Sequence, residues 1–151
     1  MLVVREGVLG NLAAFDAGGR RIERIAVRSD DCAKRVLRFE TSAGDVGVRF
    51  AGDVRLADGD IVHVDAERVI AVAVTADDVL VFRPATIGAA IDLAHALGNR
   101  HLQLLRDGET IVVRYDPLLE ALGEAHGVPV MRQARVVPAP FLHAHAPHTH
   151  D

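Results

Sequence analysis

The first 75 residues consist of short apolar or alternating runs separated by turn-forming residues. The runs are LVV (2–4), RIERIAV (21–27), VLRFET (36–41), VGVRF (46–50), IVHV (61–64) and RVIAVAV (68–74). Runs of this length and period are typical of strands. The intervening segments at 17–19, 42–45 and 57–60 carry glycine, with aspartate in the last two, and these residues supply the positive φ and the Asx turns that hairpins need. The sequence therefore predicts an all-β sandwich or barrel over residues 1–75.

Residues 76–138 show a different pattern, in which helical periods alternate with strand-like runs. A strand is predicted at 78–84, and Thr86 is suited to be the N-cap of a following helix. Apolar residues then recur at helical spacing and predict the stripe that this helix buries, namely Ile87, Ala90, Ile91, Ala94 and Leu97. Gly98 and Asn99 follow where a left-handed cap belongs, so we expect the helix to end there.

A hairpin, a second helix and a last strand complete this half. HLQLL (101–105) and TIVVRY (110–115) flank the turn RDGE and predict paired strands. Asp116 before Pro117 is typical of an N-cap and the first residue of a helix, and 128–137 predicts the last strand. The resulting order β-α-β-β-α-β predicts a C-terminal α+β domain of the ferredoxin-like kind.

Composition and charge exclude several classes of protein. Half of the residues are hydrophobic but only 4% are aromatic, so we expect a core of aliphatic side chains. The formal charge is −4, and no basic cluster with interleaved aromatics occurs, which argues against nucleic acid as a partner. No stretch has the roughly 20 apolar residues of a membrane helix, and the N-terminus does not have the pattern of a signal peptide. We expect a cytoplasmic protein with no membrane partner.

Nothing in the sequence has the arrangement typical of an active site. The N-terminal half has no Gly-rich phosphate loop, no nucleophile elbow and no clustered carboxylates, and the carboxylates of the whole chain are scattered in turns and on polar strand faces. The lone cysteine, Cys32, excludes an intramolecular disulfide and a Cys-pair zinc site, and we expect it to be structural. A metal-dependent hydrolase is the least favoured function, because no His-x-x-x-His pair with an adjacent glutamate occurs. The protein is not expected to be an enzyme.

The C-terminal tail, residues 139–151, holds half of the histidines. They lie within HAHAPHTHD at positions His143, His145, His148 and His150. Several neutral imidazoles on one segment can bind a borderline divalent ion such as nickel, copper or zinc. An affinity-tag scar or a solubilising tail remains an alternative, although tags are usually uninterrupted runs. Prolines at 138, 140 and 147 and the absence of an apolar stripe predict a mobile tail.

His101 is the most sharply placed histidine outside the tail. It follows LGNR (97–100), at the junction between the first helix and the next strand. One imidazole cannot form a metal site, but a two-fold axis nearby would bring two copies together, and tail histidines could supply further ligands. Spacing alone favours an ordinary surface or core histidine over a metal ligand at this position.

The remaining histidines have simpler interpretations. His63 is expected to face solvent with Ile61 and Asp65 on one side of a strand. His95 borders the helical stripe and could bond Asp92 three residues earlier. His126 falls in the last turn of the second helix, where the helix dipole favours an imidazolium.

Three stretches together resemble the UreE family of urease accessory nickel chaperones. These are LADGDIVHVDAERVIAVAV (56–74), LGNRH (97–101) and VRYDPLLEALGEAHG (113–127), followed by the His-rich tail. The similarity runs in order over nearly the whole chain. It implies a homodimer with a β domain of the peptide-binding kind and a ferredoxin-like domain, in which His101 binds nickel at the dimer interface and the tail histidines help to hold the ion.

The resemblance also implies a function and partners. Family members deliver Ni(II) to urease apoprotein together with an accessory GTPase and are not catalytic. The alternative function is a partner-peptide-binding module whose tail stores zinc, copper or nickel generically. Whether two dimers join around one ion stays open. Some relatives carry further histidines where this chain has Tyr115, Asp116 and Pro117, and the tail here is short, so we expect fewer ions per dimer.

Overall fold

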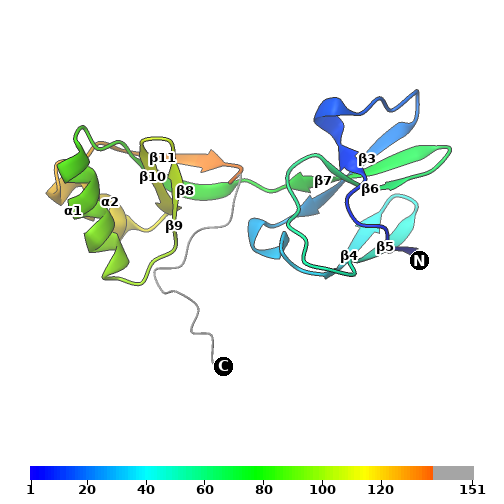
Figure 1. The fold of residues 1–151 in the computed structure, drawn as a ribbon, viewed down its shortest axis with the longest axis horizontal. Helices are drawn as coiled ribbons and strands as arrows, with labels where there is room; N and C mark the ends of the chain where they lie inside the picture. The colour runs from blue at the N-terminus through cyan, green and yellow to red at the C-terminus, as the bar shows by residue number, and fades with distance from the viewer. Residues whose placement is uncertain (138–151) are drawn as a thin grey trace. The chain divides into compact units, whose positions relative to one another are not determined.

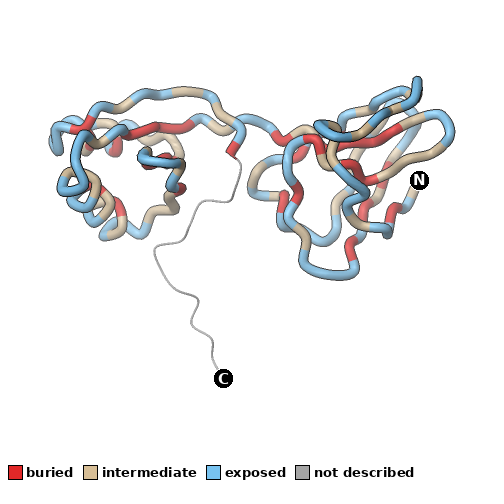
Figure 2. The backbone as a smooth tube through the Cα atoms, turned by 45° about the horizontal axis from the view of Figure 1, so that its top comes forward, coloured by how far each residue is buried: buried red, intermediate tan, exposed pale blue. Residues whose placement is uncertain are grey.

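The computed structural model describes residues 1–137, and the chain divides into two compact units, Met1–Ala76 and a second unit that begins at Asp77 (Figure 1). The tail expected to be mobile, with all four of its histidines, lies outside the described residues. Figure 2 shows that the buried positions of each unit are concentrated in its strands. Across residues 1–137, no helix combines the length and the apolar character needed to cross a bilayer.

The N-terminal unit contains two sheets and no α-helix within its described residues. One sheet has the order β1-β5-β4, formed by Leu2–Val4, Gly44–Arg49 and Val36–Thr41. The other has the order β2-β6-β7-β3, formed by Gly10–Asn11, Asp60–Val64, Arg68–Val74 and Arg21–Val27. Two short 3-10 helices, η1 and η2, span Leu12–Ala14 and Ser29–Asp31. The prediction of a β domain in this half is confirmed.

The core of this unit is aliphatic, as the composition predicts. Its buried members come from both sheets and include Val4, Ile25, Val27, Val46, Val48, Val62, Ile70 and Val72. Phe50 is the one aromatic residue buried in this cluster. Cys32 is also buried there, and its Sγ lies 3.5 Å from Arg28 O, which fits its expected structural role.

The predicted solvent face of β6 is wrong. Ile61 and Val62 are both fully buried, and the pairing of β6 with β7 shifts register between Ile61 and His63. The outer side of this sheet is not open, because Leu12 and Phe15, in and beside η1, pack onto Ile61 and its neighbours. The sequence of a strand that is covered on both faces is a continuous apolar run without alternation.

The C-terminal unit has the predicted element order. It contains β8 (Asp77–Phe82), α1 (Ile87–Gly98), β9 (Leu104–Asp107), β10 (Thr110–Arg114), α2 (Pro117–Ala125) and β11 (Val130–Arg135). The sheet order is β11-β8-β10-β9, and all neighbouring strands are antiparallel. Both predicted N-caps are confirmed, since the side chain of Thr86 accepts a hydrogen bond from Ala89 N and that of Asp116 from Leu118 N.

Both faces of this sheet are covered. The helices pack on one face, where Leu93, Leu97 and Leu119 join side chains from the strands. On the other face, Val79, Val81, Leu105, Val112 and Val137 form a smaller buried cluster. Arg135 at the end of β11 donates to Asp107 at the end of β9 at 2.6 Å, so the two edges of the sheet approach each other over this face.

Helix α2 approaches the sheet closely because it carries Gly123. A Cβ at this position would lie 2.5 Å from Cε1 of Phe82, which is fully buried. We expect Gly123→Ala to lower the free energy of unfolding by about 1–3 kcal/mol, because overpacking outweighs the gain of about 1 kcal/mol in helix propensity.

The matched control is Gly88→Ala in the first turn of α1. The nearest atom to its added Cβ is Thr86 Oγ1 at 3.9 Å, an ordinary contact, so this variant should gain up to about 1 kcal/mol. Urea denaturation of both variants checks the contrast. A shift in the same direction for both would show that helix propensity alone governs these sites.

Candidate metal site

His101 lies in an exposed turn directly after α1. Leu97 is fully buried and Leu102 packs partly against the same core, so the residues between them must reverse the chain at the surface. His101 N donates to Gly98 O at 2.9 Å within this turn. The strand expected at 101–105 begins only at Leu104, because the turn occupies its first residues.

The backbone of His101 is left-handed, with φ of +56°. In the described part of the chain it is the single residue other than glycine with positive φ. The expected left-handed cap at Gly98 and Asn99 is wrong: Gly98 ends the helix, and Asn99 has φ −61° and ψ −21°, which is right-handed. Two further turn residues, Asn99 and Arg100, follow the helix before the left-handed His101.

This geometry is costly for histidine. A left-handed conformation disfavours an L-residue with a Cβ by about 1–2 kcal/mol, and glycine would avoid most of that cost. Such outliers concentrate at functional positions, where the surrounding structure holds them in place. The imidazole of His101 therefore lies at the surface on a left-handed backbone that glycine would adopt more easily.

His95 is exposed in the last turn of α1 and bonds Asn99 rather than the expected Asp92. Asn99 Nδ2 lies 3.2 Å from His95 Nε2, so the amide donates and the ring nitrogen accepts. The prediction chose the wrong neighbour because both i−3 and i+4 positions lie on the same helix face. Asn99 belongs to the GNRH stretch, so one end of α1 carries two histidines and this amide.

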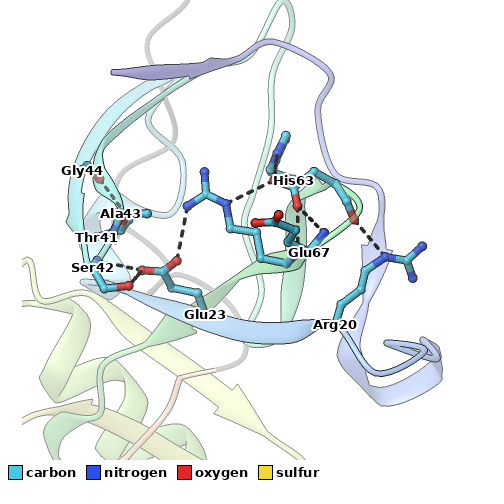
Figure 3. A network of polar contacts seen from close by, with 10 residues as sticks. Arg20, Glu23, Thr41, Ser42, Ala43, Gly44, His63 and Glu67 are labelled. Atoms are coloured by element: carbon cyan, nitrogen blue, oxygen red, sulfur yellow. Dashed lines mark hydrogen bonds and ion pairs between the residues drawn. The ribbon is translucent and has the colours of Figure 1, made fainter.

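His63 takes part in a polar network inside the N-terminal unit (Figure 3). Its Nε2 lies 3.1 Å from Asp65 Oδ2, and its side chain is only 19% exposed, so the predicted solvent position is wrong. Arg68 Nε donates to the same Asp65 oxygen at 3.2 Å, and Arg68 Nη1 lies 3.5 Å from Glu23 Oε2. Glu23 accepts bonds from Ser42 N and Oγ at 2.9 and 3.1 Å, which joins the two sheets.

The carboxylates of this network are held ionised. Backbone N–H groups of Glu67 and Arg68, followed by the side chains of Arg68 and His63, hold the pKa of Asp65 far below its usual range. Burial raises the pKa of Glu23, but the bonds from Ser42 and the charges of Arg21 and Arg68 outweigh it, so the net pKa is lowered. His63 is therefore a structural partner of a carboxylate.

No metal centre is assembled by residues 1–137 alone. No three His, Cys, Asp or Glu side chains within that range come together in a way that could hold an ion. His126 is exposed at the C-cap of α2, and His143, His145, His148 and His150 lie outside the described residues. An ion at His101 would need additional ligands from solvent, from beyond residue 137 or from a second copy.

Comparison with known proteins identifies the family. The description "UreE urease accessory protein, N-terminal domain" matches residues 6–75. A urease accessory protein UreE of Bacillus sp. (strain TB-90) is 37% identical over 137 residues, covering 90% of this chain and 93% of that protein.

Two further relatives carry the same name. The protein of Geobacillus kaustophilus is 34% identical over 99% of this chain and 100% of its own length. That of Corynebacterium efficiens is 40% identical over 85% of this chain and 86% of its own length. The chain belongs to the UreE family of urease accessory proteins.

Proposed function

We propose that this protein is a nickel chaperone that delivers Ni(II) to urease apoprotein during assembly of its metal centre. His101 from each of two chains holds the ion at a homodimer interface, and tail histidines complete the ligand set. The observation that carries the proposal is the left-handed backbone that displays His101 at the exposed end of α1. Family membership supplies the link to urease.

Donor chemistry supports nickel as the cargo. Imidazole nitrogen suits nickel, and also zinc and copper, while water fills the remaining positions. A set of neutral histidines without thiolate holds an ion exchangeably, as a delivery protein requires. The protein acts in the cytoplasm without catalysing a reaction itself, with the urease accessory GTPase and urease apoprotein as partners.

The architecture supports the same assignment. The strand order β11-β8-β10-β9, all antiparallel, supports a ferredoxin-like fold for the C-terminal unit. Each chain carries one His101. A two-fold dimer supports the proposal because its symmetric interface would bring the His101 residues of the two chains together. Residues 1–75 are the proposed β domain, 76–138 the metal-binding and dimerisation domain, and 139–151 the metal-recruiting tail.

Removal of residues 143–151 tests the division of labour between the two classes of histidine. We expect the truncated protein to bind fewer nickel ions, and more weakly, while its molar mass in solution stays that of the full-length dimer. Nickel titration by calorimetry and light scattering measure these quantities. His126→Ala removes one exposed histidine at the end of α2 and should change neither. Nickel binding equal to that of the full chain would rule out the tail's role.

A further inference from the structure

An apolar groove lies between α1 and the β9–β10 hairpin. Its volume is about 450 Å³. Ile87, Ile91 and Ala94 line it from the helix, and Leu104, Arg106 and Ile111 from the hairpin. The groove belongs wholly to the C-terminal unit, and β9, which forms its outer wall, is an edge strand.

The helix wall of this groove departs from the predicted stripe. Ile87 is 80% exposed and Ile91 is 62% exposed, whereas Leu93 and Leu97 are buried. Two large aliphatic side chains one turn apart, beside a concave surface, are unlike a scattered exposed residue and mark a binding surface. Removing an isoleucine side chain from water is favourable, so an occupant that covers both side chains is stabilised there.

We propose that this groove is the docking site for Phe141 and Leu142, the apolar pair that directly precedes the tail histidines. Both residues lie outside the described part of the chain. They are the only large apolar residues after Val137. The proposal rests on the function proposed above, and it specifies how the tail is brought to the His101 site.

The chain has the length to reach the groove. Val137, the last described residue, is buried in the cluster that also contains Leu105 of β9. Phe141 follows four residues later, a reach of about 13 Å when extended. Because β9 is an edge strand, the chain can pass around it from the helix-free face to the helix side without crossing another strand.

The same distances connect the groove to His101. Helix α1 has 12 residues and is therefore about 18 Å long, with Ile87 at its start and His101 just beyond its end. Residues 143–151 can span up to about 30 Å. A tail anchored by Phe141 and Leu142 thus has enough chain to bring histidines to His101, and anchoring raises their effective concentration there.

A second copy of the chain is the competing occupant. An interface centred on a pair of His101 residues lies at the opposite end of α1 from Ile87, about 18 Å away. Such an interface does not need the Ile87 end of the groove. The proposal therefore commits to the protein's own tail.

Methyl NMR of the metal-free, full-length protein tests the docking directly. The test variant is Phe141→Ser/Leu142→Ser, and the matched control is His148→Ala/His150→Ala. We expect the δ-methyl signals of Ile87 and Ile91 to shift by more than a linewidth in the test variant, because the ring current of Phe141 is lost. The control should leave them in place, and the signal of Ile25, buried in the N-terminal unit, should not move in either variant.

Two results would overturn the docking. Unchanged Ile87 and Ile91 signals in the test variant would show that the pair does not occupy the groove. Signals that instead move on dilution, together with a fall in molar mass, would identify a second copy as the occupant. Both measurements are made without metal, so they are independent of nickel binding.

Nickel titration separates this inference from the proposed function. The test variant should bind the same number of ions as the full-length protein but about tenfold more weakly, because the histidines remain while their local concentration falls. Groove signals that shift without any nickel binding by the parent protein would uphold the docking and reject the chaperone function. Equal nickel affinity in parent and variant would reject the link between groove and site.

Discussion

His101→Gly should abolish the tight nickel site and, at the same time, raise the stability of the fold. The ion loses one imidazole from each chain, so we expect nickel affinity to fall at least 100-fold, beyond the effect of removing a supporting residue. The backbone at this position has φ of +56°, which glycine adopts without strain. After the larger entropy loss of glycine on folding, about 0.5–1 kcal/mol of added stability should remain.

His101→Asn is the matched control for this prediction. Asparagine tolerates the left-handed region and keeps a polar side chain, but it is a poor nickel ligand compared with imidazole. It should lose nickel as the glycine variant does, with a smaller change in stability. Calorimetry with nickel and urea denaturation measure the two effects. A glycine variant less stable than the parent would show that contacts of the imidazole outweigh the backbone strain.

Nickel affinity should fall about 100-fold between pH 7.5 and pH 5.5. Only the neutral imidazole binds a metal, and histidine in model peptides titrates near pH 6.5, so lowering the pH by two units costs about tenfold per histidine ligand. A pair of histidine ligands therefore accounts for about 100-fold, and each further histidine in the ligand set adds to the slope. Calorimetric titrations at pH 5.5, 6.5 and 7.5, corrected for buffer protonation, measure this dependence.

The fold itself should stay intact over the same range. Glu23 and Asp65 have pKa values lowered below the usual carboxyl range, so their stabilising contribution is present at pH 5.5 and is lost only as the pH falls further, through those lowered values. Circular dichroism across the titration checks this. In the nickel titrations, the affinity of the variant without residues 143–151 should depend less steeply on pH than that of the full chain. Affinity that does not change with pH would exclude histidine as the principal ligand.

Local chemistry explains where the sequence predicted the fold correctly. The strands β3, β4 and β7 match their predicted ranges, and Thr86 and Asp116 cap the helices as expected. These features depend on period-2 patterns, turn residues and side chains that bond their own neighbouring backbone. Each operates within a few residues along the chain, so a single sequence carries enough information.

The errors occur where two patterns share the same letters. In α1, Leu97 belongs to two possible apolar stripes. One contains Ile87 and Ile91 and the other contains Leu93, and both have helical spacing. In the structure, α1 turns the side that carries Leu93 toward the strands, so Leu93 packs against the sheet. In β6, the predicted alternation failed because η1 covers the side expected to face water.

The sequence by itself determined the order of strands and helices, the helix N-caps, the aliphatic core and the histidines that can bind a metal. Only the tertiary structure decided the backbone conformation and the surface position of His101. Leu97 is buried and Leu102 packs partly against the same core, so the chain must reverse between them, and the left-handed residue of that reversal is His101. The same packing leaves Ile87 and Ile91 beside an open groove. Such outcomes depend on contacts between segments far apart in the chain, which periodicity and capping do not encode.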